Sequence, residues 1–201
     1  MYNTDAVKIQ EYSRQSADNL ASVILMVSLS IQQNWAGVGA QLQDVKKYKA
    51  ESKFLWGNKR KTYKYVQAKK HLMYNQFLAV LASSKSDNEK AFSLMKIFLR
   101  IDGLGMVKAG FVCQLSAGLV GCIDLHNIRL YGIKESEISL SKSVKSEKLR
   151  RTKIEKYISI CHNIGTANLW DTWCNHLATT NKYWRDGQHV STVHYTYLQD
   201  S

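Results

Sequence analysis

Apolar residues recur along most of the chain at intervals of three and four positions, the spacing that places them on one side of an α-helix. The segment 3–33 carries a single apolar stripe at Val7, Ile9 and Tyr12, and from Leu20 onward it is apolar almost all round. This pattern predicts one long helix that passes from the surface into a core. No stretch shows the strict alternation that would predict a half-buried strand.

Further helices are expected wherever the same periodicity returns between turn-forming residues. Ser86 and Glu89 have the spacing of a capping box, which predicts a helix start at this point. The chain of 201 residues contains no proline, so its helices are not interrupted by their strongest breaker. The expected helices cover about 40–50, 62–83, 86–99, 106–115, 138–159 and 165–184. The prediction is an all-α protein with one domain over residues 1–201 and no internal linker.

The charge of the chain points to an anionic partner. It has 28 Lys and Arg against 16 Asp and Glu, a net charge of +12, and clustered cations favour polyanions because binding releases counterions. Seven of the basic residues lie within 53–70, interleaved with aromatic residues. We expect Lys59, Arg60 and Lys61 to contact backbone phosphates, while Trp56 or Tyr63 stacks on a base. The alternative for such a charge run is a solvated surface.

The cysteines predict neither a disulfide framework nor a metal knuckle. Cys113, Cys122, Cys161 and Cys174 are separated by 9, 39 and 13 positions, which is not the C-x₂-C spacing of a zinc or iron–sulfur site. We therefore expect reduced, buried thiols in a cytoplasmic protein. The most apolar run, residues 20–31, is too short to span a bilayer, so no membrane association is expected.

A Gly-x-Gly turn interrupts the helical pattern after Ile101. Gly103 and Gly105 allow positive φ and leave no Cβ to obstruct a ligand, so the first N–H groups of the following helix can converge on a phosphate. Lys108 would add a positive charge beside that phosphate. The alternative is an ordinary corner between two helices with a glycine turn.

Three separated segments together resemble the endonuclease III-like superfamily of helix-hairpin-helix DNA glycosylases. The segment FLRIDGLGMVKAGFVCQL, within about 92–115, resembles the hairpin, and GCIDLHNIRL, within the loop 116–129, resembles the signature that carries the family's aspartate. Upstream, LSIQQNWAGVGAQL resembles the family's helix-end pattern, with the Gln-to-Trp spacing one residue short. The matching positions are Ile101, Gly103, Leu104, Gly105 and Ala109 in the hairpin, and Asp124, His126 and Arg129 in the loop.

This resemblance implies a two-lobed helical fold with a DNA-binding cleft between the lobes. Asp124 would be catalytic: its carboxylate would stabilise positive charge on the sugar and orient or deprotonate the attacking water. Gln32, Gln33 and Asn34 would enter the duplex to fill the space left by a flipped nucleotide. Further implied contacts to DNA come from Gly103, Leu104, Gly105 and Lys108, while His126 and Arg129 support the helix that follows Asp124. The alternative for Asp124 is a simple N-cap of that helix, and the two roles are compatible.

The chain also departs from the family pattern. Asp102 replaces the usual proline, and Val107 stands where members with lyase activity carry their Schiff-base lysine. Lys108 is one position later, which on an ideal helix turns it by about 100°. The four-cysteine iron–sulfur loop is absent. We therefore expect a monofunctional glycosylase without a lyase step and without a resident cofactor. A monovalent cation bound at the hairpin remains an open alternative.

The expected partner is double-stranded DNA, bound by a monomer in the cytoplasm or nucleoid. Two alternatives stay open from the sequence. The fold could serve a glycosylase-like enzyme that acts on hypermodified pyrimidines without excising them. It could also serve a non-enzymatic, architectural DNA-binding protein that uses the hairpin for phosphate contact alone.

Overall fold

The computed structural model describes residues 2–31, 35–141, 144, 146–180 and 198 of the chain. All regular structure in these residues is helical, which confirms the all-α prediction. No helix in the described ranges is long and apolar enough to cross a membrane. The α-helices are α1 (Tyr2–Gln15), α2 (Ala17–Leu29), α3 (Val38–Tyr48), α4 (Gly57–Ala82), α5 (Asp87–Phe98), α6 (Met106–Ala117), α7 (Leu125–Leu130), α8 (Glu135–Ile138), α9 (Glu147–Ile164) and α10 (Thr166–Thr180), with short 3-10 helices at Trp35–Gly37 (η1) and Lys49–Glu51 (η2).

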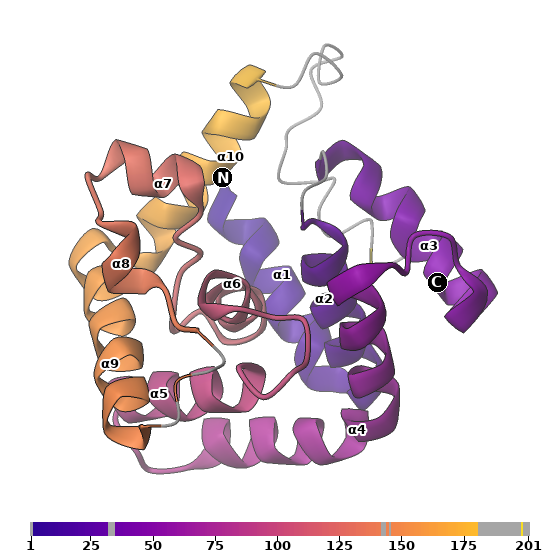
Figure 1. The fold of residues 1–201 in the computed structure, drawn as a ribbon, viewed down its shortest axis with the longest axis horizontal. Coiled ribbons are helices and arrows are strands. Elements are labelled where there is room, and N and C mark those ends of the chain that lie inside the picture. Colours follow the sequence, from indigo (N-terminus) through magenta and orange to yellow (C-terminus); the bar gives the residue numbers. More distant parts are fainter. Residues whose placement is uncertain (1, 32–34, 142–143, 145, 181–197, 199–201) are drawn as a thin grey trace.

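Helix α6 runs through the centre of the molecule. It is surrounded by the other helices in Figure 1, where it is seen nearly end-on. Ten of its twelve residues are buried, and they include small side chains such as Ala109 and Gly110 that let neighbours approach closely. Because α6 is apolar almost all round, it can only be stable with partners on every side. The hairpin and the segment after α6 are therefore both fixed to the core.

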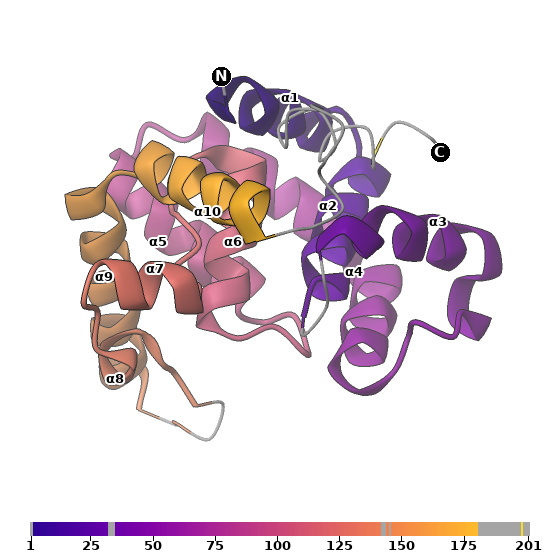
Figure 2. The ribbon, with the colours of Figure 1, turned by 90° about the horizontal axis from the view of Figure 1, so that it is seen from above.

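The remaining helices divide around α6. Helices α2, α3 and α4 lie on one side and α7, α8 and α9 on the other, as Figures 1 and 2 show from two directions. Helix α2 packs against α1, α3, α4 and α6, while α10 packs against α1, α7 and α9. Residues from both sides meet next to the N-terminal end of α6, where the sequence predicted a functional site.

Several predicted starts and ends are confirmed, and two predicted helices are wrong. The helix expected over 138–159 starts only at Glu147, after α8 has ended at Ile138. The capping box at Ser86 and Glu89 is present at the start of α5, and α6 starts at Met106 as expected. The single helix over 3–33 is instead two helices, because Ser16 adopts an extended conformation with φ −157° and accepts the N–H of Asn19. A serine cap stops a helix without changing the apolar period on either side, so periodicity alone did not reveal the break.

Candidate active site

The hairpin turn between α5 and α6 is packed against the start of α4. Gly103 has φ +89°, as expected, and a Cβ at this position would clash with the carbonyl oxygen of Asn58 and lie 2.5 Å from Oγ1 of Thr62. The hydroxyl of Thr62 also donates to the carbonyl oxygen of Asp102, at 2.8 Å. Leu104 is buried beneath the turn. The turn is thus held rigidly from one side, and glycine is required at 103 by both conformation and space.

Gly105 differs from the prediction. It has φ −101° and ψ −177°, an extended conformation open to any residue, so the expected positive φ is wrong at this position. It forms the N-cap of α6 and is exposed, and no atom lies within 4 Å of the place where its Cβ would be. The first N–H groups of a helix have no partner within the helix. The absence of a side chain at Gly105 therefore keeps this helix N-terminus accessible from outside.

Lys108 points into the molecule. Its Nζ donates to Oγ of Ser30 at the C-terminal cap of α2, at 3.0 Å, and lies 5.5 Å from the ring centroid of Phe111. Burial lowers the pKa of the Lys108 amine, and the acidic groups of Cys122 and Asp124 partly offset this effect. The expectation that Lys108 stands beside a surface phosphate is therefore corrected: its amine is directed toward Ser30 and Phe111, where the charge of Asp124 acts on it.

Asp124 occupies the N-cap of α7. Its Oδ1 accepts the N–H of Asn127 at 2.9 Å, so the N-cap alternative raised by the sequence is confirmed. The side chain is half-buried, and its charge acts on the Lys108 amine. A capping bond occupies one of the two carboxylate oxygens and holds the group in place. The cap is compatible with a chemical role for the other oxygen.

The loop before Asp124 is held by a buried glutamine. Gln114 on α6 accepts the N–H of Cys122 through Oε1, at 3.0 Å, and donates through Nε2 to the carbonyl oxygen of Thr166, also at 3.0 Å. Both ends of one side chain thus join the loop to the start of α10. The sequence reasoning missed Gln114, although a polar residue within the apolar run of α6 is a signal that could have revealed it.

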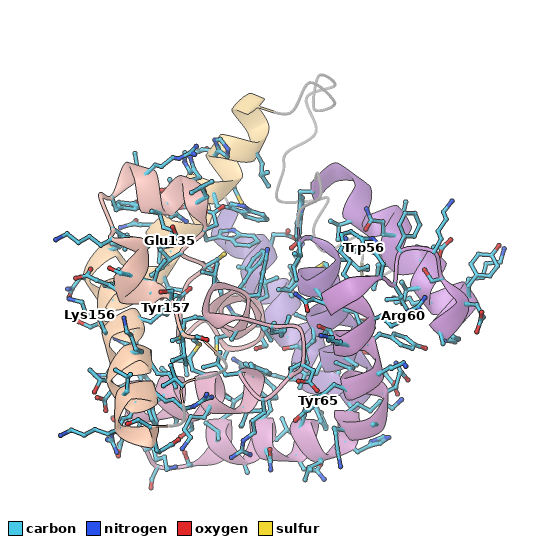
Figure 3. All side chains as sticks on the ribbon, viewed as in Figure 1. Trp56, Arg60, Tyr65, Glu135, Lys156 and Tyr157 are labelled. Carbon is cyan, nitrogen blue, oxygen red and sulfur yellow. The ribbon has the colours of Figure 1, made fainter. Side chains whose placement is uncertain are left out.

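Tyr157 holds the same loop from the other side. Its hydroxyl donates to the carbonyl oxygen of Gly121 at 3.0 Å and accepts the N–H of Ile123 at 3.1 Å. Figure 3 shows Tyr157 on α9, on the side that faces α6. Burial raises the pKa of the Tyr157 hydroxyl, so the group stays neutral and can both donate and accept. Asp124 therefore follows a loop whose backbone is fixed on both sides.

His126 and Arg129 lie on α7, beyond Asp124. The ring of His126 stacks on that of His176 from α10, with centroids 3.9 Å apart and an interplanar angle of 15°. Burial and the neighbouring His176 lower the pKa of His126, while Asp124 opposes the shift. His126 thus joins α7 to α10, which accords with the supporting role expected of it. Arg129 is exposed, and its role stays a prediction.

An aromatic cluster lies beneath Lys108. Trp35 and Trp173 meet edge to face with centroids 4.9 Å apart, and both contact Phe111, at 5.8 and 5.1 Å. Trp170 lies 5.3 Å from Trp173. These rings come from η1, α6 and α10, so the cluster joins both sides of the molecule under the site. Such a wall excludes water from the Lys108 amine, which strengthens the electrostatic interactions of that amine.

The basic segment at the start of α4 differs from its prediction in three respects. Helix α4 starts at Gly57 and not near Thr62, so this segment is helical. Lys59 is only 2% exposed, with Nζ 4.8 Å from the ring of Trp56, and it is therefore not the surface phosphate contact that we expected. Tyr63, at 8% exposed, is too buried to stack on a base.

Other residues of that segment remain accessible. Arg60 and Lys61 are exposed, and Nε of Arg60 donates to the carbonyl oxygen of Leu55 at 2.8 Å. Trp56 is 49% exposed, and Figure 3 shows it with Arg60 at the α3–α4 edge of the molecule. Burial and the charge of Lys108 lower the pKa of Lys59. Lys59 thus lies between the exposed Trp56 and the buried site.

The expected duplex-inserting residues Gln32, Gln33 and Asn34 lie outside the described residues. Their flanks are described: Ser30 receives the Lys108 hydrogen bond, and Trp35 belongs to the aromatic cluster. In the part of the chain that the structure describes, no group of three or more His, Cys, Asp or Glu could hold a metal ion. All four cysteines are buried and unpaired by disulfides, and the thiols of Cys113, Cys122 and Cys161 have pKa values raised by burial.

Comparisons with known proteins do not extend this description. No protein-family model matches the chain, and no match is found among curated proteins or solved structures.

Proposed function

We propose that this protein is a helix-hairpin-helix DNA glycosylase that releases a base from duplex DNA with Asp124. The observation that carries the proposal is the inward position of the Lys108 amine, hydrogen-bonded to Ser30, where the charge of Asp124 acts on it. Asp124 comes from the loop after α6 and Lys108 from the helix that the Gly-x-Gly turn begins. A carboxylate whose charge acts on an enclosed amine is suited to stabilising a charged transition state.

In the proposed reaction, the bond between the sugar C1′ and the base breaks while positive charge develops on the sugar. The Asp124 carboxylate stabilises that charge and accepts a proton from the attacking water, whose oxygen bonds to C1′. The base departs with the bonding electrons and is protonated as it leaves. The rigid hold on the loop by Gln114 and Tyr157 supports this role, because catalysis depends on a fixed position for the charged group.

DNA would reach the site across the N-terminal end of α6. The exposed Gly105 end of that helix offers N–H groups to one phosphate, and Arg60 and Lys61 offer positive charge nearby on α4. We further propose that Gln32, Gln33 and Asn34 fill the space left by the flipped nucleotide. The two sides of the molecule would then act as the lobes of a DNA-binding cleft, in a monomer that associates with DNA in the cytoplasm or nucleoid.

The proposal is tested by incubating the full chain with duplexes that each carry one uracil, oxidised, alkylated or hypermodified base, and then assaying for abasic sites. We expect base release from at least one duplex and loss of release in Asp124→Asn. DNA binding without base release from any duplex would favour the architectural alternative. A changed but retained base would favour the exchange alternative.

A second candidate is a glycosylase that also cleaves the strand through Lys108. The observation that favours it is the inward position of the Lys108 amine, with its lowered pKa and its neighbour Asp124. An unprotonated amine can attack C1′ and form a Schiff base. Borohydride added during turnover would trap a covalent protein–DNA adduct, which Lys108→Gln should abolish. Absence of the adduct, with base release intact, identifies the monofunctional enzyme.

A further inference from the structure

A second pocket lies between α1, α2, α3 and α4. Its volume is about 310 Å³, at the lower end of the range of roughly 300–1,000 Å³ typical of small-molecule sites. None of the residues assigned to the proposed reaction lines it. Figures 1 and 2 show α3 beside α2 and α4 at one edge of the molecule, and these helices contribute most of the lining residues of the pocket.

The cations of the pocket converge from three helical elements. Lys46 lies near the end of α3, Lys49 is the first residue of η2 directly after it, and Lys70 lies on α4. The acidic lining residue is Asp18, which is paired with Lys70. Three ammonium groups against one carboxylate leave a positive charge that favours an anion of more than one charge. A phosphate monoester has such a charge and accepts several hydrogen bonds at once.

The other walls are suited to a flat organic body. Tyr12 and Tyr63 present aromatic surface, Leu25 and Val45 are buried aliphatic side chains, and Gln67 offers an amide. Burial raises the pKa of the Tyr63 hydroxyl, so it remains a hydrogen-bond donor. Apolar surface with a few polar groups, next to a cluster of cations, is the arrangement that binds a phosphorylated aromatic molecule.

The backbone at Lys49 supports a role for its side chain. Lys49 has φ +52° and ψ −127°, and it is the one non-glycine residue with positive φ in the described parts of the chain. This conformation is normally occupied by glycine and costs about 1–3 kcal/mol for other residues. A lysine occupies this position in the lining of a cationic pocket, and a ligand contact through its side chain would offset the cost.

We propose that this pocket binds a small phosphorylated ligand of mononucleotide size, with the phosphate held by Lys49, Lys46 and Lys70 and the aromatic body against the half-buried Tyr12. The proposal is independent of the glycosylase reaction. Binding requires Asp18 to release Lys70 or to share it with the phosphate. The ligand therefore links α2, α3 and α4 on the side of α2 where Lys70 and Asp18 meet.

The test is titration calorimetry of the full chain with thymidine 5′-monophosphate, thymidine and inorganic phosphate. We expect the nucleotide to bind at least about tenfold more tightly than either fragment, because both parts of the pocket contribute. Binding of phosphate alone with the same affinity as the nucleotide, or no binding of the nucleotide, would overturn the proposal.

Two variants distinguish binding in this pocket from nonspecific attraction by the positive charge of the protein. Lys49→Gly removes the cation and the backbone strain together, so the Tm should stay equal or rise while nucleotide affinity falls about tenfold. Lys47→Gln is the matched control, since Lys47 is exposed on the neighbouring α3 and does not line the pocket. An equal loss of affinity in both variants would mean nonspecific attraction. A loss of duplex binding in Lys49→Gly without nucleotide binding would assign the lysines to DNA and overturn the proposal, whatever the outcome of the base-release assay.

Discussion

The amine of Lys108 and the hydroxyl oxygen of Ser30 lie 3.0 Å apart, and their hydrogen bond joins the first turn of α6 to the end of α2. The Ser30 hydroxyl in turn donates to the carbonyl oxygen of Val27, at 2.7 Å. The serine therefore has a fixed acceptor direction toward the lysine. This contact keeps the Lys108 amine inside the molecule at the end of α2, within range of the charge of Asp124.

Removal of the Ser30 hydroxyl should destabilise the fold. A hydrogen bond to a charged, mostly buried group contributes about 1.5–3 kcal/mol, so we expect Ser30→Ala to lower the free energy of unfolding by that amount. Urea denaturation measures the difference. Ser93→Ala is the matched control, because the Ser93 hydroxyl bonds only to a carbonyl oxygen of its own helix at the surface. A cost no larger than that of the control would show that Lys108 does not depend on Ser30.

The two glycines of the hairpin should respond differently to alanine. Gly103→Ala introduces a Cβ at positive φ against the backbone of Asn58, and we expect a loss of about 2–4 kcal/mol of stability. Gly105→Ala meets open space and should change stability by less than about 0.5 kcal/mol. If the Gly105 end of α6 contacts DNA, the same variant should weaken duplex binding. Thermal unfolding and fluorescence anisotropy separate the two effects, and equal destabilisation by both alanines would contradict the described turn.

Tyr157→Phe should loosen the loop that carries Asp124. The change leaves the N–H of Ile123 buried without its acceptor, at a cost of about 1–3 kcal/mol. Tyr74→Phe removes a hydroxyl that bonds to the carbonyl oxygen of Arg14 at the surface and should cost under about 0.5 kcal/mol. Chemical denaturation of both variants tests this. If Tyr157→Phe is stable but base release falls, the hydroxyl acts mainly by positioning Asp124.

The His126–His176 stack predicts a loss of stability on mild acidification. The pKa of His126 is lowered in the folded protein by burial and by His176, so the unfolded chain binds more protons below about pH 6.5. The contribution of the neutral His126 to the free energy of unfolding is therefore complete above that pH, and it is lost as the pH falls through it. We expect the wild type to lose more stability between about pH 7.5 and 5.5 than His126→Gln does. Equal losses in the two proteins would contradict the shift.

The sequence predicted correctly those features of the fold that depend on residues close together in the chain. The capping box at Ser86, the start of α6 at Met106 and the Asp124 cap all depend on residues within a few positions of each other. The break at Ser16 was missed because a serine cap leaves the apolar period intact. The φ of Gly105 could not be predicted from local sequence either, because it depends on how the hairpin turn packs in the fold.

Within the candidate site, the directions of long side chains were the hardest feature to predict from the sequence. Lys59 was expected at the surface from the charge of its segment and Lys108 from its place after the Gly-x-Gly turn, yet tertiary packing turns both inward. An ideal-helix rotation placed Lys108 away from the site, but a lysine side chain is long enough to reach across a neighbouring turn. Tyr157 acts on a loop more than thirty positions earlier in the chain, so its contacts could not be predicted from spacing.

Replacing Asp124 with asparagine or alanine separates the effect of the residue on base release from its effect on stability. Asparagine can also cap α7, so Asp124→Asn should change stability by only a few tenths of a kcal/mol, whereas Asp124→Ala should lose about 1 kcal/mol. Thermal unfolding of both variants provides the structural baseline for the decisive measurement.

That measurement is the single-turnover rate of base release by Asp124→Asn on the duplex that the wild type processes best. We predict a rate at least about a hundredfold below wild type with unchanged duplex affinity, because the carboxylate is lost while the cap and the hairpin remain. A variant that releases the base as fast as the wild type would contradict the role of Asp124 and, with it, the proposed reaction.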